Sequence, residues 1–74
     1  MNYKKLASEG ICVTIFCFES SDKSLKFRAY FKDFVNNYLY NPFVNGTYPL
    51  YDSYPEAEKA MSLAIKKYKK SKLK

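Results

Sequence analysis

Along residues 25–32, every second residue is apolar, and the residues between them are three cations and a tyrosine, namely Lys26, Arg28, Tyr30 and Lys32. If this segment is a strand, these four side chains lie on one face, because successive side chains of a strand point to opposite faces. Cations at this spacing suit a phosphate chain, and the tyrosine ring could stack on a base. An ordinary solvated strand face has the same pattern. The segment therefore predicts a site for nucleic acid or an acidic surface, provided that it is a strand.

A second basic surface is expected at the C-terminal end of the chain, because residues 66–74 carry the whole net charge of +6. Residues 1–65 are balanced, with seven basic and seven acidic side chains. A positive pole of this kind attracts phosphate backbones or acidic protein surfaces. Lysines near a helix C-terminus also complement the helix macrodipole, so a purely structural interpretation stays open. The lysines of this end are Lys66, Lys67, Lys69, Lys70, Lys72 and Lys74.

An aromatic cluster in the middle of the chain is the third candidate surface. Its members are Tyr38, Tyr40, Phe43, Tyr48 and Tyr51. Tyrosine is enriched at protein interfaces because it combines a large contact area with a hydroxyl group. With 8 Tyr and 6 Phe, the chain holds more rings than one helix over a small sheet can cover. These residues are therefore predicted to bind a protein, although many of the rings are also expected to complete the core.

Catalytic and metal chemistry is not expected from this composition. The chain has no His, which removes the commonest general base and metal ligand. Cys12 and Cys17 are five apart and match no zinc spacing. Gly10 and Gly46 are too few for a glycine-rich phosphate loop. We expect no enzyme activity, no metal and no cofactor.

Two strands are predicted in the first half of the chain. The apolar run Ile11 to Phe18 is rich in β-branched and aromatic residues, which predicts a strand in the centre of the sheet with its two cysteines in the core. The alternation over residues 25–32 favours a second strand, paired antiparallel to the first. A helix stays open for this segment, because apolar residues also recur there at helical spacing. The residues at that spacing are Phe27, Tyr30, Phe31, Phe34, Val35 and Tyr38.

The second half of the chain predicts a weak hairpin followed by a clear helix. The pair Asn45-Gly46 is a strong hairpin signal, while the neighbouring prolines limit pairing to short or edge strands near Leu39 to Val44 and Thr47 to Tyr51. The sequence from Ser53 to Glu56 has the spacing of a capping box, which predicts that a helix starts here. Its apolar stripe consists of Ala57, Ala60, Met61, Ala64, Ile65 and Tyr68.

The predicted fold class is α+β, with a small antiparallel β-sheet in the order β-β-(β-β)-α and one C-terminal amphipathic helix packed on one face. A chain of 74 residues fits a single small domain, residues 1–74, whose Lys-rich helix end and tail span 66–74. The run Ile11 to Phe18 is far shorter than the roughly 20 residues of a membrane helix. We therefore expect a cytoplasmic protein and no membrane partner.

Two functional hypotheses follow, both for a non-catalytic interaction protein. Lys, Asn, Tyr, Phe and Ile have A/T-rich codons, which indicates a low-GC bacterium or a phage-infected host cell. The first hypothesis is a small phage or mobile-element type modulator that inhibits a host or defence protein by direct binding. The alternative is a small nucleic-acid-binding module that uses the basic helix end and the Lys/Arg/Tyr strand face. The assembly is left open between a monomer and a homodimer.

Overall fold

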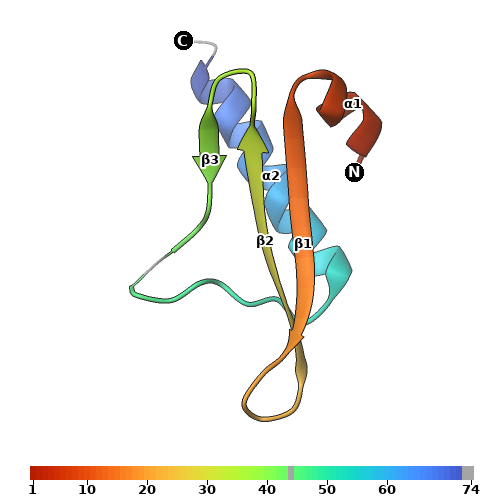
Figure 1. Ribbon diagram of the computed structural model, residues 1–74, viewed down its shortest axis with the longest axis vertical. Helices are drawn as coiled ribbons and strands as arrows, with labels where there is room; N and C mark the ends of the chain where they lie inside the picture. The colour runs from red at the N-terminus through yellow and green to blue at the C-terminus, as the bar shows by residue number, and fades with distance from the viewer. Residues whose placement is uncertain (44, 73–74) are drawn as a thin grey trace.

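The computed structural model describes residues 1–43 and 45–72 as a three-stranded antiparallel sheet with a long helix behind it (Figure 1). The sheet has the strand order β1-β2-β3, and the confirmed fold class is α+β with a C-terminal helix. Val44 and residues 73–74, including Lys74, lie outside the described residues. The elements in chain order are α1 (Tyr3–Ser8), β1 (Ile11–Glu19), β2 (Leu25–Asp33), β3 (Tyr38–Tyr40) and α2 (Tyr54–Lys72).

The ambiguous segment after residue 24 is a strand, as the alternation favoured, and its helical alternative is wrong. β2 pairs antiparallel with β1 without interruption, from Ile11 opposite Asp33 to Glu19 opposite Leu25. Both strands have nine residues, so every residue of β2 has a partner on β1. This unbroken register fixes which side chains of the two strands share a face.

The odd-numbered side chains of β2 lie on the face toward α2, and three of them, Phe27, Ala29 and Phe31, pack with the apolar stripe of the helix. Phe31 is fully buried, and small residues such as Ala29 and Ala57 let the helix approach the sheet closely. The stripe and the start of α2 are as predicted, because the Ser53 Oγ accepts a hydrogen bond from the backbone N–H of Glu56 at 3.3 Å. The buried apolar residues are Ile11, Ala29, Phe31, Ala57, Met61 and Ile65.

Two expectations for the first strand are wrong. β2, not β1, is the central strand, because β3 pairs with β2 and leaves β1 at the edge of the sheet. Cys12 and Cys17 are both exposed rather than buried in the core. An edge strand has a neighbour on one flank only, and Cys12 also points to the face that α2 does not cover. The strand β1 therefore carries apolar residues on both of its faces, although among the described residues only the face toward α2 is packed against another element.

Of the two short strands predicted around Asn45-Gly46, the described residues contain one, β3, and none follows it before α2. Asn45 and Gly46 both have positive φ, at 53° and 77°, which is the conformation that a type I′ turn requires. Among the described residues of this segment, pairing with β2 involves the three residues of β3 and Tyr51, whose backbone exchanges hydrogen bonds of 2.8 and 2.9 Å with Phe27. The intervening Pro42 and Pro49 have no N–H to donate, which explains the interruption.

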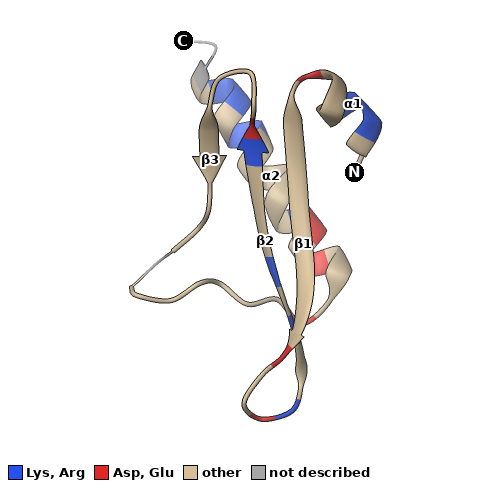
Figure 2. Cartoon of the chain, in the orientation of Figure 1, with Lys and Arg blue, Asp and Glu red and all other residues tan. Residues whose placement is uncertain are grey.

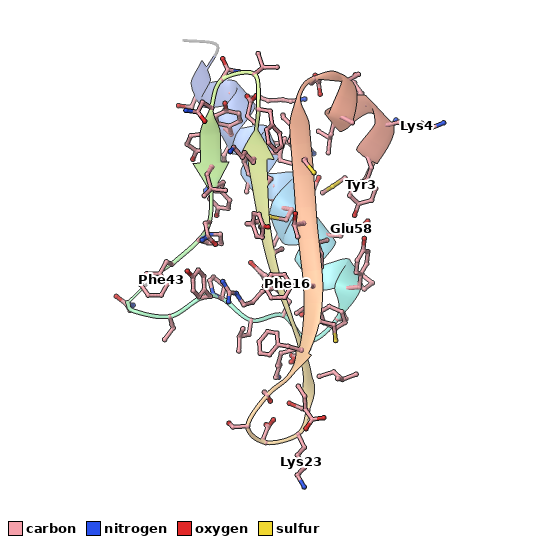
Figure 3. All side chains as sticks on the ribbon, viewed as in Figure 1. Tyr3, Lys4, Phe16, Lys23, Phe43 and Glu58 are labelled. Atoms are coloured by element: carbon pink, nitrogen blue, oxygen red, sulfur yellow. The ribbon has the colours of Figure 1, made fainter. Side chains whose placement is uncertain are left out.

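The helix α1 has no counterpart in the predicted elements. Asn2 caps it, because its side-chain oxygen accepts the backbone N–H of Lys5 at 3.0 Å. The Tyr3 hydroxyl donates to the Glu58 carboxylate at 2.6 Å and ties this helix to α2 (Figure 3). α1 lies beside the upper part of β1 in Figure 1 and contacts that strand. An asparagine before a short polar run was the only sequence signal for this element.

Candidate functional site: the uncovered face of the sheet

One face of the sheet is covered by no helix among the residues that the structure describes. α2 packs on the face that carries Ala29 and Phe31, and no helix crosses in front of the opposite face in Figure 1. We call this opposite side the outer face. Neither β1 nor β2 places a carboxylate on it, because their acidic residues, Glu19 and Asp33, are on the opposite face. The strand residues of the outer face are Cys12, Thr14, Phe16, Phe18, Lys26, Arg28, Tyr30, Lys32 and Leu39.

Arg28 lies at the centre of the outer face and is held by aromatic rings. Its guanidinium carbon lies 3.6 Å from the centroid of the Tyr48 ring and 5.2 Å from that of the Phe16 ring. Tyr48 packs in turn against Phe43, with 4.7 Å between ring centroids. Figure 3 shows Phe16 on β1 and Phe43 on the connection after β3. Because a guanidinium is planar, rings that fix its plane also fix the direction of its N–H donors.

The other cations of the outer face differ in their pairing. Lys26 forms an ion pair with Asp52, whose hydrogen bond and charge raise the pKa of Lys26. Asp52 reaches it because the neighbouring Tyr51 pairs with β2. The Nζ atom of Lys32 lies 4.9 Å from the centroid of the Phe34 ring. In the part of the chain that the structure describes, no carboxylate forms an ion pair with Arg28 or Lys32.

Tyr30 is flanked by Arg28 and Lys32 on the same strand, and all three side chains are half-buried. Thr14 faces it across the strand pair, so no bulky ring on β1 stands directly opposite. The exposed ring of Phe16 lies one cross-strand pair further along β1, opposite Arg28. Along β2 the outer face therefore carries one ring, Tyr30, between the cations Arg28 and Lys32, and β1 adds the ring of Phe16. The structure brings together all four residues predicted for this strand face.

The predicted aromatic cluster is divided between the two sides of the sheet. On the side of α2, the Tyr38 ring stacks on the Tyr68 ring at 4.5 Å and 9°, and the Tyr40 ring stacks on Phe31 at 5.1 Å and 23°. Tyr40 packs against the core, whereas Tyr38 is 40% exposed and lies at its edge on Tyr68. Tyr51, which opposes Phe27 in its backbone pair, is half-buried and packs against the same core.

Phe43 and Tyr48 are the two members of the cluster that lie beside the outer face. Phe43 is 58% exposed, and Tyr48 is placed against the Arg28 guanidinium. No local sequence pattern indicates this contact, because it depends on where the long connection after β3 folds. The structure therefore adds Phe16, Phe43 and Tyr48 to the four residues predicted on the strand face.

The Lys-rich end of α2 lies on the other layer of the domain. Figure 2 shows Lys and Arg along β2 and, separately, along the C-terminal half of α2 behind the sheet. Lys66, Lys67 and Lys70 are exposed, whereas Lys69 pairs with Glu9 of the α1 end at 2.7 Å. The two predicted basic surfaces are therefore separate and face opposite sides.

Asp33 is a buried carboxylate that sequence reasoning did not single out. It is 1% exposed, and it accepts hydrogen bonds at 2.7 Å from both the Tyr68 hydroxyl and the Asn36 amide. The backbone N–H groups of Val35 and Asn36 bind its other oxygen at 3.0 and 3.1 Å. These bonds hold the pKa of Asp33 well below its usual range, and the carboxylate raises the pKa of Tyr68 to about 12. Because this cluster joins the end of β2 to α2, its role is to position the helix.

Similarity to known proteins gives no guide to the function of this surface. A scan against protein-family models, a search of curated proteins and a search of solved structures each return no match to the chain. Across residues 1–43 and 45–72, no group of three or more His, Cys, Asp or Glu side chains could hold a metal ion. Nor do the helices of those residues include one that is long and apolar enough to span a membrane.

Proposed function

We propose that the protein is a non-catalytic binding domain that holds single-stranded nucleic acid on the outer face of its sheet. The observation that carries this proposal is the contact of Arg28 with the rings of both Phe16 and Tyr48, next to Tyr30 and Lys32, on a face that no described helix covers. Arginine and lysine neutralise phosphates, and exposed rings offer platforms for bases. The net charge of +6 favours the approach of a polyanion.

The ring positions favour a single strand over a duplex. Bases within a duplex are stacked on each other, whereas unpaired bases are free to stack on aromatic side chains. Tyr30 and Phe16 lie on adjacent strands of an open surface, where a base can approach without a pocket wall in its way. Contacts from lysine and arginine to phosphates carry no sequence information. We therefore expect binding with weak sequence preference.

A second candidate function is the direct binding of a host or defence protein by a phage or mobile-element type modulator. The observation that favours it is the exposure of large apolar side chains near the outer face. Phe34, Leu39 and Phe43 are 64%, 53% and 58% exposed. Exposed apolar surface of this kind often marks a protein partner site.

The proposal is tested with a labelled single-stranded oligonucleotide of about 12 nucleotides, a length within the usual site size of such surfaces. Fluorescence anisotropy at about 50 mM salt gives the affinity of the unchanged protein, of Tyr30→Ala and of Tyr30→Phe. Loss of one stacked base is worth about 1–3 kcal/mol, so Tyr30→Ala should bind about 5- to 150-fold more weakly. Tyr30→Phe keeps the ring and should bind as the unchanged protein does.

A duplex of the same sequence and the double variant Lys4→Gln, Lys59→Gln are the controls. Both lysines are exposed and lie outside the outer face, on α1 and α2. The duplex should bind more weakly than the single strand, and the double variant should keep most of the affinity. The proposal fails if the single strand does not bind at low salt, or if folded Tyr30→Ala binds it unchanged. A specific protein complex that is lost in Phe43→Ala would then support the second candidate function.

A further inference from the structure

An open groove runs along α2 on the side of β3, on the layer opposite to the outer face. It consists of two adjoining hollows of about 400 and 500 Å³ that share Tyr40, Ala64 and Lys67 as lining residues. The stacked rings of Tyr38 and Tyr68 also line the first hollow. The groove is therefore a continuous depression between the helix and the last strand.

The floor of the groove is apolar. Ala60 and Ala64 contribute methyl groups from α2, and Tyr40 and Tyr51 contribute rings from the sheet side. Leu63 stands at the helix edge of the groove and is 54% exposed. Such a floor, with an exposed leucine beside it, can accommodate an aliphatic side chain of a ligand. Moving that side chain out of water would contribute favourable free energy to binding.

The rim of the groove on the helix side is cationic. Lys66, Lys67 and Lys70 all line it, at positions three, four and seven residues after Leu63. Residues at this spacing share one side of a helix. Among the described residues, none of these three lysines forms an ion pair, whereas Lys69 is engaged with a glutamate of the α1 end.

We propose that this groove docks an acidic amphipathic segment of a partner protein, with aliphatic side chains on the floor and carboxylates along the lysine rim. Charge complementarity selects an anion, and the apolar floor selects a ligand with aliphatic groups beside its negative charges. A phosphate chain would match the lysines but leave Leu63 and the alanines in water. One face of Tyr38 and one of Tyr40 already stack on other rings, which leaves little platform for bases.

The groove is independent of the proposed nucleic-acid surface, because the two lie on opposite layers of the domain. A protein segment and a nucleic acid could therefore occupy the domain together. This mode of recognition, a helix laid in a groove, uses anchors at helical spacing on the ligand. The bound segment would present a narrow apolar stripe with acidic residues on both sides.

The test uses a fluorescein-labelled peptide of Glu and Leu, roughly 15 residues long, with its leucines on one helical stripe. A second peptide of the same composition spreads the leucines around the helix. The protein variants are Leu63→Gln, the triple variant Lys66→Gln, Lys67→Gln, Lys70→Gln and the charge-matched triple variant Lys4→Gln, Lys23→Gln, Lys59→Gln. Anisotropy measures peptide affinity, and amide chemical shifts in a nuclear magnetic resonance titration locate the site.

The striped peptide should bind the unchanged protein and shift amides of α2 and β3. The groove triple variant should weaken it about tenfold, from three exposed ion pairs of a few tenths to 1 kcal/mol each. Leu63→Gln should weaken it as well and should leave oligonucleotide binding unchanged.

The inference is overturned if both peptides bind equally, if the charge-matched triple variant loses as much affinity as the groove variant, or if the shifts fall on β1. Competition by the oligonucleotide, or binding of anionic lipid vesicles in place of the peptide, would also overturn it. None of these outcomes changes the effect of Tyr30→Ala on oligonucleotide binding, so the two proposals fail separately.

Discussion

The double variant Arg28→Gln, Lys32→Gln gives the sharpest test of the outer face, because it changes how binding depends on salt. Each phosphate neutralised on a single strand contributes a slope of about 0.7 to the fall of log affinity with log salt. Arg28 and Lys32 are the cations of this face without an ion pair in the described chain. Removing both should lower the slope by about 1.4. Between about 50 and 200 mM salt, one contact corresponds to a change of about 2.6-fold in affinity and two to about 7-fold.

Anisotropy titrations at four or more salt concentrations measure this slope. Arg28→Lys keeps the charge and should keep the slope, although the ring-held planar fork is lost. Lys26→Gln should change the slope less than either other cation, because Asp52 already balances Lys26. The reasoning is refuted if the double variant keeps the slope of the unchanged protein. It is also refuted if a matched pair on the other layer, Lys66→Gln with Lys67→Gln, flattens the slope as much.

Four predictions concern the fold that presents these surfaces. Met61→Ala removes a side chain that is 1% exposed and should cost about 2–5 kcal/mol of unfolding free energy, measured by chemical denaturation. The Asp33 carboxylate has a lowered pKa in the folded protein, so it stabilises the fold above the unfolded pKa of about 3.9 and loses this effect as the pH falls. Asp33→Asn should therefore lower the melting temperature at neutral pH and make it depend less on pH in the acid range. Tyr68 has a raised pKa, so its contribution to the stability of the fold should be complete below about pH 10 and decline toward pH 12. Melting temperatures measured over this alkaline range should lose this decline in Tyr68→Phe. Gly10 and Gly46 both have positive φ, so each can serve as a control for the other. Gly10→Ala should lower the free energy of unfolding more than Gly46→Ala, because the new methyl group would overlap the Val35 side chain at Gly10 and meets open space at Gly46.

The predictable parts of this fold are those that short stretches of sequence determine. Strict alternation over residues 25–32 placed Arg28 and Tyr30 on one face once the segment was a strand. The cap at Ser53 and the apolar stripe of α2 are likewise local signals, since hydrogen bonds and packing recur within a few residues. The strand interpretation succeeded over the helical one because the unbroken pairing with β1 satisfies every residue of the segment.

The unpredicted parts depend on contacts between distant segments. The edge position of β1 follows from the pairing of β3 with the other side of β2, and nothing within Ile11 to Phe18 encodes that choice. The ring of Tyr48 reaches Arg28 only because the connection after β3 folds back to Tyr51. The bond from Tyr68 to Asp33 spans 35 residues and needs the packed helix before it can form.

The small size of the domain connects these observations to function. One helix of 19 residues covers one face of the sheet, and the rest of the chain contains no second layer within residues 1–43 and 45–72. An antiparallel sheet with one solvated face normally carries polar residues there. Here that face instead carries Phe16, Phe18 and Tyr30 among its cations, and only the Tyr48 segment packs over part of it. Rings left in water gain by contact with a ligand, and cations without carboxylate partners select an anionic one. Because the same surface carries both the rings and the cations, it suits a ligand that has negative charges and flat bases together, and single-stranded nucleic acid is such a ligand.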